Sequence, residues 1–70
     1  MNTWSIYLDA TADGVRNLGI LVQVVAFDRR AARALARTCL TSYGYTDVSI
    51  IHCYYTGYDP SGLGARVVSC

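Results

Sequence analysis

The chain of 70 residues carries a net charge of +1, and hydrophobic residues make up 53% of it against 16% charged residues. This length allows one domain, spanning residues 1–70, and excludes an active-site cleft between two domains. The apolar content excludes a disordered tail, and the near-neutral charge alone does not imply a polyanionic partner.

The first predicted element is a half-buried strand from Trp4 to Asp9, because apolar and polar residues alternate there. A turn over residues 11–14 follows, since its Asp-Gly pair adopts positive φ at low cost. A second strand is expected within Arg16–Phe27, where β-branched residues gather. One face of that strand carries Ile20, Val22, Val24 and Ala26.

A helix is expected over Arg29–Leu40, because alanine and leucine dominate its interior and Asp28 is a favourable N-cap. Gly44 is expected to end the helix as the residue beyond its C-cap. At 100° per residue, one face of the helix carries apolar side chains that we expect to pack on the sheet. That face consists of Ala31, Ala32, Leu35, Ala36 and Cys39.

A third strand is predicted over Asp47–Thr56, and its apolar and aromatic residues on both faces favour a central place in the sheet. After a loop over Gly57–Gly64, a short edge strand is expected over Ala65–Cys70. The order β-β-α-β-β predicts an α+β fold: a small antiparallel sheet of about four strands with one helix packed on one face. The opposite face would stay uncovered and would carry Tyr7, Leu21, Val25, Ile51 and Tyr55.

Three cysteines, Cys39, Cys53 and Cys70, lie far apart in the sequence. Their odd number and wide spacing favour reduced thiols that pack as small hydrophobes, with a Cys39–Cys53 disulfide as the alternative. Replacing all three by small residues should then preserve the fold. With one histidine and no Cys-x-x-Cys pair, no metal site is expected. No signal peptide or membrane span is recognised, so the chain is expected to be cytoplasmic.

Four of the six arginines lie in a nine-residue stretch inside the predicted helix, residues 29–37, and no acidic residue occurs between Asp28 and Asp47. They are Arg29, Arg30, Arg33 and Arg37. Arginine binds carboxylates and phosphates with its planar fork, so this flank is a candidate partner-binding surface. The alternative is an ordinary solvated helix face, and in both cases charge reversal there should leave the fold nearly intact.

Tyrosines crowd into the predicted third strand and the loop after it, where Tyr54, Tyr55 and Tyr58 are candidate partner-binding residues. Tyrosine offers a large contact area and a polar tip for little loss of rotamer entropy. The alternative is that these residues only satisfy strand propensity.

No arrangement of residues predicts catalysis, and no cofactor is expected. His52 and Cys53 are adjacent in a strand, so their side chains point to opposite faces and cannot form a nucleophile–base pair. His52 is instead expected to be a partly buried strand residue. The glycines after Pro60 lack the remaining residues of phosphate-binding and dinucleotide-binding motifs.

Residues Val24–Leu35 run from a strand through an Ala-x-Asp join into an alanine-rich helix. This pattern, together with the β-β-α-β-β order, resembles small phage-encoded proteins, including some anti-CRISPR proteins. The resemblance implies a stoichiometric binder that blocks a host nucleoprotein surface, and it assigns no functional residue.

The sequence therefore predicts a non-enzymatic protein-binding module, of the kind that inhibits a host complex. Its partner would be a host protein or a second copy, with an acidic or nucleoprotein surface, and no membrane. The alternative is a small nucleic-acid-binding domain that uses the arginine flank. A homodimer through the uncovered sheet face or an edge strand fits both hypotheses.

Overall fold

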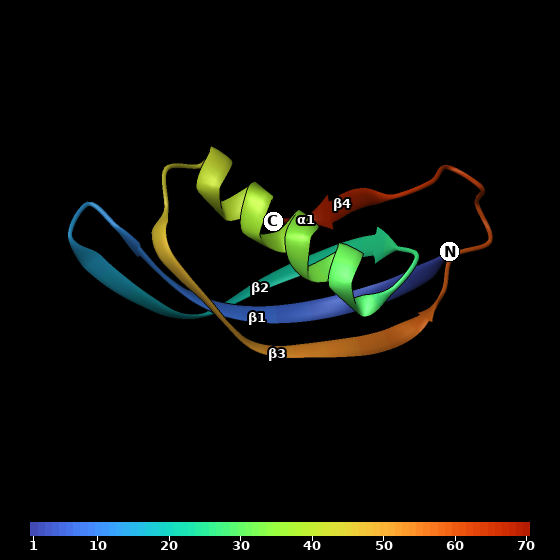
Figure 1. Ribbon diagram of the computed structural model, residues 1–70, viewed down its shortest axis with the longest axis horizontal. Helices are drawn as coiled ribbons and strands as arrows, with labels where there is room; N and C mark the ends of the chain where they lie inside the picture. The colour runs from blue at the N-terminus through green and yellow to red at the C-terminus, as the bar shows by residue number, and fades with distance from the viewer.

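A computed structural model describes residues 1–70 as one four-stranded antiparallel sheet with a single helix across one face (Figure 1). The elements are β1 (Asn2–Ala12), β2 (Val15–Ala26), α1 (Arg29–Ser42), β3 (Thr46–Tyr58) and β4 (Arg66–Ser69). The strand order is β3-β1-β2-β4, which places β3 and β4 at the edges. The predicted α+β class and element order are confirmed. No helix has the length and apolarity needed to cross a membrane.

Strands β1 and β2 form a long hairpin whose tip projects beyond the end of α1 (Figure 1). Asp13 and Gly14 occupy the turn with φ of 52° and 75°. Two consecutive positive φ angles match the twist of a two-residue hairpin turn, as predicted from the Asp-Gly pair. The register pairs Ile6 with Val22 and Trp4 with Val24, so the apolar alternations of both strands face α1 together.

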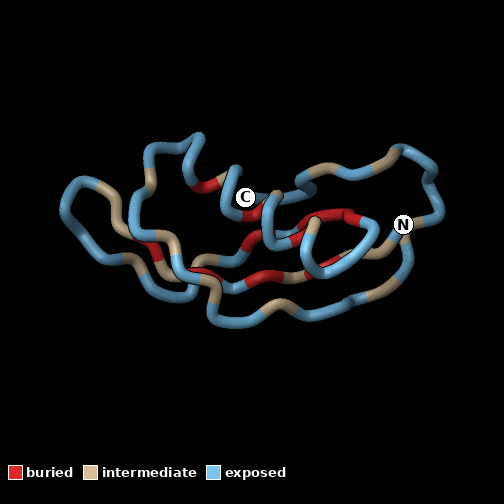
Figure 2. The backbone as a smooth tube through the Cα atoms, in the orientation of Figure 1, coloured by how far each residue is buried: buried red, intermediate tan, exposed pale blue.

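The core lies between the two central strands and the inner side of α1, where Figure 2 shows the buried segments. The Trp4 indole N–H donates to the Ala26 carbonyl at 3.2 Å, so the largest core side chain also has its polar atom satisfied. No buried side-chain nitrogen or oxygen lacks a hydrogen-bond partner. The ten core residues are Trp4, Ile6, Leu8, Ala10, Val22, Val24, Ala26, Ala32, Ala36 and Leu40.

Helix α1 begins and ends through the two predicted caps. The Asp28 carboxylate accepts from the Ala31 backbone N–H at 2.8 Å, which satisfies one of the free amides of the first turn. Tyr43 is the C-cap, and Gly44 follows it with a φ of 90°, a conformation that a glycine adopts without strain.

The face of α1 that is buried differs slightly from the predicted face, because the helix is rotated about its axis. Ala32 and Ala36 are buried as predicted, but the third buried residue is Leu40, whereas Leu35 and Cys39 are only half-buried. The physical reason is the short strand β4. The flank of the helix that carries Leu35 and Cys39 faces this four-residue strand, which covers less surface than β1 or β3 would.

The prediction that the third strand is central is wrong, because β3 pairs with β1 alone and forms one edge of the sheet. Its inner side packs Val48, Ile50 and Cys53 against the core. Its other apolar positions are aromatic or half-exposed, and Ile51 retains 48% exposure. A tyrosine counts as apolar in the sequence although its hydroxyl can lie in water, so an edge strand rich in tyrosine has the apolar pattern of a central strand.

Bulges in β3 also change which residues face away from the helix. The register shifts between Tyr7 and Leu8 and again between Thr3 and Trp4. Each extra residue exchanges the two faces for everything that follows it. Tyr55 consequently lies opposite Trp4 on the helix side of the sheet, and its predicted place on the outer face is wrong. Tyr7 and Leu21 do share the outer face, whereas Val25 is buried there between its register partners Thr3 and Arg66.

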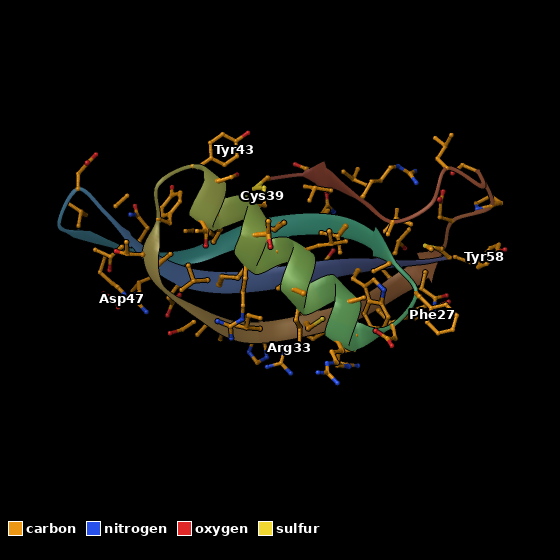
Figure 3. The ribbon with its side chains drawn as sticks, turned by 45° about the horizontal axis from the view of Figure 1, so that its top comes forward. Phe27, Arg33, Cys39, Tyr43, Asp47 and Tyr58 are labelled. Atoms are coloured by element: carbon orange, nitrogen blue, oxygen red, sulfur yellow. A yellow bond between two sulfur atoms is a disulfide. The ribbon has the colours of Figure 1, made fainter.

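The expectation of three reduced thiols is also wrong. Cys39 of α1 and Cys70 at the end of β4 form a disulfide, with their Cα atoms 6.6 Å apart, and Cys53 is the free cysteine (Figure 3). The alternative Cys39–Cys53 bridge is not formed. Sequence spacing could not reveal the pairing, because it arises only where β4 returns to the helix.

The Asp59 carboxylate closes the loop between β3 and β4. Its Oδ2 accepts from the Ser61 hydroxyl at 2.7 Å and from the Arg66 guanidinium at 3.1 Å. These donors, Ser61 first and Arg66 second, hold the pKa of Asp59 below its ordinary value of 3.8.

This loop should lose stability in acid through Asp59. Because the pKa of Asp59 is depressed in the folded state, the carboxylate stabilises the fold above its unfolded value, and the contribution disappears as the pH falls through the folded value. We expect the melting temperature of the parent to fall more steeply below about pH 4 than that of Asp59→Asn. Calorimetric melts across this range measure the difference. Parallel pH profiles for the two proteins would contradict the assignment.

Candidate functional site

Four arginines form a continuous cationic surface on the exposed flank of α1. This arginine row, Arg29, Arg30, Arg33 and Arg37, lines a shallow open hollow together with Ala34. None of the four has a salt-bridge partner, since the one ion pair of the molecule joins Arg66 to Asp59. The predicted place of Arg29, Arg33 and Arg37 on one helix flank is confirmed, and Arg30 lies on the same flank.

Two members of the row are anchored to the edge strand. Arg29 donates to the carbonyl of Cys53, and Arg37 donates to the carbonyl of Val48 at 3.1 Å. Arg29 also lies over the Trp4 ring, with its guanidinium carbon 5.5 Å from the ring centroid. The expectation that Arg29, Arg33 and Arg37 can be reversed with the fold nearly intact is therefore corrected for Arg29 and Arg37. Both bridge the helix to β3 and protect carbonyls at an open sheet edge.

Arg30 and Arg33 make no hydrogen bond to the protein and are fully available. Figure 3 shows Arg33 reaching past the edge of β3 into solvent. Arg29 and Arg30 lie in the first turn of α1, where no acidic residue is present. The positive end of the helix dipole disfavours cations in that turn, so these two charges destabilise the helix.

The predicted tyrosine cluster is divided among three places. Tyr54 lies on the outer face of the sheet, opposite Ser5. Tyr55 lies on the helix side and packs edge-on against Trp4, with ring centroids 5.7 Å apart. Tyr58 is the last residue of β3 and is 68% exposed (Figure 3). Tyr54 and Tyr55 are neighbours in β3 and point to opposite faces of the sheet, so these rings do not form one surface.

A different aromatic group lies on the outer face, and sequence reasoning missed it. Tyr54 stacks on His52 at 5.4 Å and meets Tyr7 edge-on at 6.1 Å. We call Tyr7, His52 and Tyr54 the outer-face cluster. His52 is exposed rather than partly buried as predicted, because the bulge after Ile50 turns it outward. The alternation of β1 predicts Tyr7 on this face, but that His52 and Tyr54 lie beside it depends on the β1–β3 register.

Cys53 lies on the helix side beneath Arg29. Burial raises the pKa of the Cys53 thiol, and the nearby Arg29 and Arg33 guanidinium groups offset only part of the shift. The thiol is therefore neutral at physiological pH and a poor nucleophile. No three metal-binding side chains gather anywhere in the fold. The arrangement is suited to binding through charge and aromatic contact.

Comparison with known proteins gives no relative: no protein-family model, curated protein or solved structure matches the chain. The resemblance to small phage-encoded proteins stays a prediction from the Val24–Leu35 pattern.

Proposed function

We propose that this domain is a non-enzymatic binding module that holds an acidic surface of a partner protein against the arginine row. Four guanidinium groups share one flank without a carboxylate to neutralise them, and this observation carries the proposal. Arg29 and Arg37 each donate one hydrogen bond to β3 and keep further N–H donors for a ligand. These hydrogen bonds also hold the two guanidinium groups in place, which lowers the side-chain entropy lost when a ligand binds.

In this proposal the domain acts in the cytoplasm by occupying the partner's surface, as an inhibitor of a host protein or nucleoprotein complex would. A small chain with a rigid sheet and one charged helix flank suits stoichiometric blocking, since the contact needs only a rigid, pre-organised patch. The phage-like Val24–Leu35 pattern supports the same role.

Nucleic-acid binding is the second candidate function. The arginine fork also matches phosphate, and the outer-face cluster offers exposed rings at the same edge of the sheet.

The test of the proposed function is the double variant Arg30→Gln/Arg33→Gln. These two arginines make no contact that the fold needs, so the melting curve should match the parent, while binding to immobilised poly-glutamate should weaken about tenfold or more. Surface plasmon resonance at several salt concentrations measures the affinity. Arg29→Gln is expected to lose about 1 kcal/mol of stability as well, because its contacts with Trp4 and Cys53 disappear.

The matched control is Val15→Glu/Leu18→Glu, which changes the net charge by the same amount at exposed positions of the hairpin, away from α1. It should bind as the parent does. If both variants weaken binding equally, the effect comes from net charge and not from the arginine row. If Arg30→Gln/Arg33→Gln binds as the parent does, the arginine row is not the binding surface.

A further inference from the structure

The outer-face cluster has the geometry of a stacking platform. Its rings come from neighbouring strands, Tyr7 from central β1 and His52 and Tyr54 from edge strand β3. The three are in mutual contact through Tyr54, yet Tyr54 keeps 50% and Tyr7 37% of its surface exposed. Rings held by their neighbours but open on one side can receive a further flat ring at little entropic cost.

The residues that flank Tyr54 and Tyr7 on the neighbouring strands are uncharged. Ser5 lies beside Tyr54, and Leu21 lies beside Tyr7 in the register. The nearest carboxylate along β1, Asp9, is engaged as the acceptor of the Gly19 backbone N–H at 2.9 Å. Asp9 is the one carboxylate of β1, and the four cations of the arginine row outnumber it at the neighbouring β3 edge, so the charge balance there favours a polyanion.

The arginine row reaches the same sheet edge from the opposite side. The Arg29 guanidinium is bonded to the carbonyl of Cys53, the residue between His52 and Tyr54 in β3. Cations and stacking rings are thus separated only by the thickness of one strand. A cationic track beside aromatic platforms is the arrangement by which proteins bind single-stranded nucleic acid without reading its sequence.

We propose that single-stranded nucleic acid binds along the β3 edge. Its unpaired bases stack on the outer-face cluster, and its sugar–phosphate chain follows the edge where the arginine row lies. The proposal rests on the second candidate function, nucleic-acid binding. It uses the same arginines as the proposed protein interface, and it adds a surface that an acidic protein would not need. Duplexes bind more weakly, because their bases are already stacked and paired and cannot reach the rings.

The experiment measures binding of a fluorescent oligothymidylate of about 12 nucleotides by anisotropy, beside a duplex of equal length. Tyr7→Leu/Tyr54→Leu removes two rings but retains apolar bulk, and it should weaken single-strand binding about tenfold or more. The control Phe27→Leu/Tyr43→Leu removes two exposed rings outside the cluster and should bind as the parent does. Tyr54→Trp, which keeps a ring at that position, should bind at least as tightly as the parent, so a loss of folding in the double variant would not hide the result.

Salt dependence separates the two surfaces. Arg30→Gln/Arg33→Gln should flatten the dependence of affinity on salt, whereas the tyrosine variant should lower affinity with an unchanged slope. Equal affinity for duplex and single strand, or parental binding by Tyr7→Leu/Tyr54→Leu, would overturn the platform. Binding to poly-glutamate without binding to the oligonucleotide would overturn this inference while leaving the proposed function standing. A switch from dimer to monomer on loss of the tyrosines, with no oligonucleotide bound, would assign the face to a second copy instead.

Discussion

Replacing Leu40 with aspartate is expected to unfold the whole domain. Leu40 is 2% exposed and closes the core at the C-terminal end of α1, beside the central strands. Truncating a buried leucine costs about 2–5 kcal/mol, and the carboxylate adds an unpaired buried charge. Domains of this kind have only about 5–15 kcal/mol of stability, and small ones lie at the lower end. Far-ultraviolet circular dichroism with thermal melts measures the outcome.

Two substitutions on the same helix serve as controls. Leu35→Asp changes a half-buried residue on the β4 flank, so its carboxylate can reach water and the loss of stability should be smaller. Thr41→Asp changes an exposed neighbour of Leu40 and should alter stability by less than about 0.5 kcal/mol. A cooperative melt of Leu40→Asp close to that of the parent would show that the buried face of α1 is assigned incorrectly.

Local chemistry explains why the elements themselves are readable from the sequence. The Asp13-Gly14 turn, the Asp28 cap and the Gly44 terminator each act within a few residues of their own position. The same holds for the alternation that places Trp4, Ile6 and Leu8 together in the core. Where the determining contacts are local, the order β-β-α-β-β follows from the residues alone.

The place of β3 is not readable in this way. Tyrosine side chains can be buried through the ring or exposed to solvent through the hydroxyl, so the sequence of β3 is compatible with an edge strand and with a central strand. Its bulges depend on how β3 pairs with β1, and each bulge exchanges inward and outward residues. Tyr54 and His52 therefore meet Tyr7, and Tyr55 meets Trp4, in a combination that simple alternation cannot produce.

The arginine row shows the same limit at the candidate site. Clustering and the lack of acidic residues identify Arg29, Arg30, Arg33 and Arg37 from the sequence. Their division into anchored and free residues depends on the edge carbonyls of β3, which only the assembled sheet supplies. Arg30 and Arg33 are thus the positions at which binding can be tested without disturbing the fold.

Breaking the Cys39–Cys70 disulfide is expected to lower the free energy of unfolding by about 3–4 kcal/mol, because the bridge spans 31 residues of sequence and restricts the unfolded chain. The reduced protein should also release its C-terminal strand. β4 has only four residues and three register pairs with β2, so without the bridge little holds it. An apolar groove already lies at this place, lined by Cys70 and by residues of the hairpin and of the helix end, among them Leu40 and Tyr43, and the departure of β4 would widen it.

Cys39→Ser/Cys70→Ser tests this expectation by urea unfolding and by hydrogen exchange, beside Cys53→Ser as the control. The double variant should lose protection over Arg66–Ser69 and along the paired edge of β2, while β1 and β3 keep theirs. Cys53→Ser leaves the bridge in place and removes a half-buried thiol, so its loss should stay near 1 kcal/mol. If both variants unfold at the same urea concentration as the parent with and without reductant, the bridge does not hold β4. Loss of all protected amides in the double variant would instead make the disulfide a requirement for the whole fold, since a core of ten residues would then be too small to stand alone.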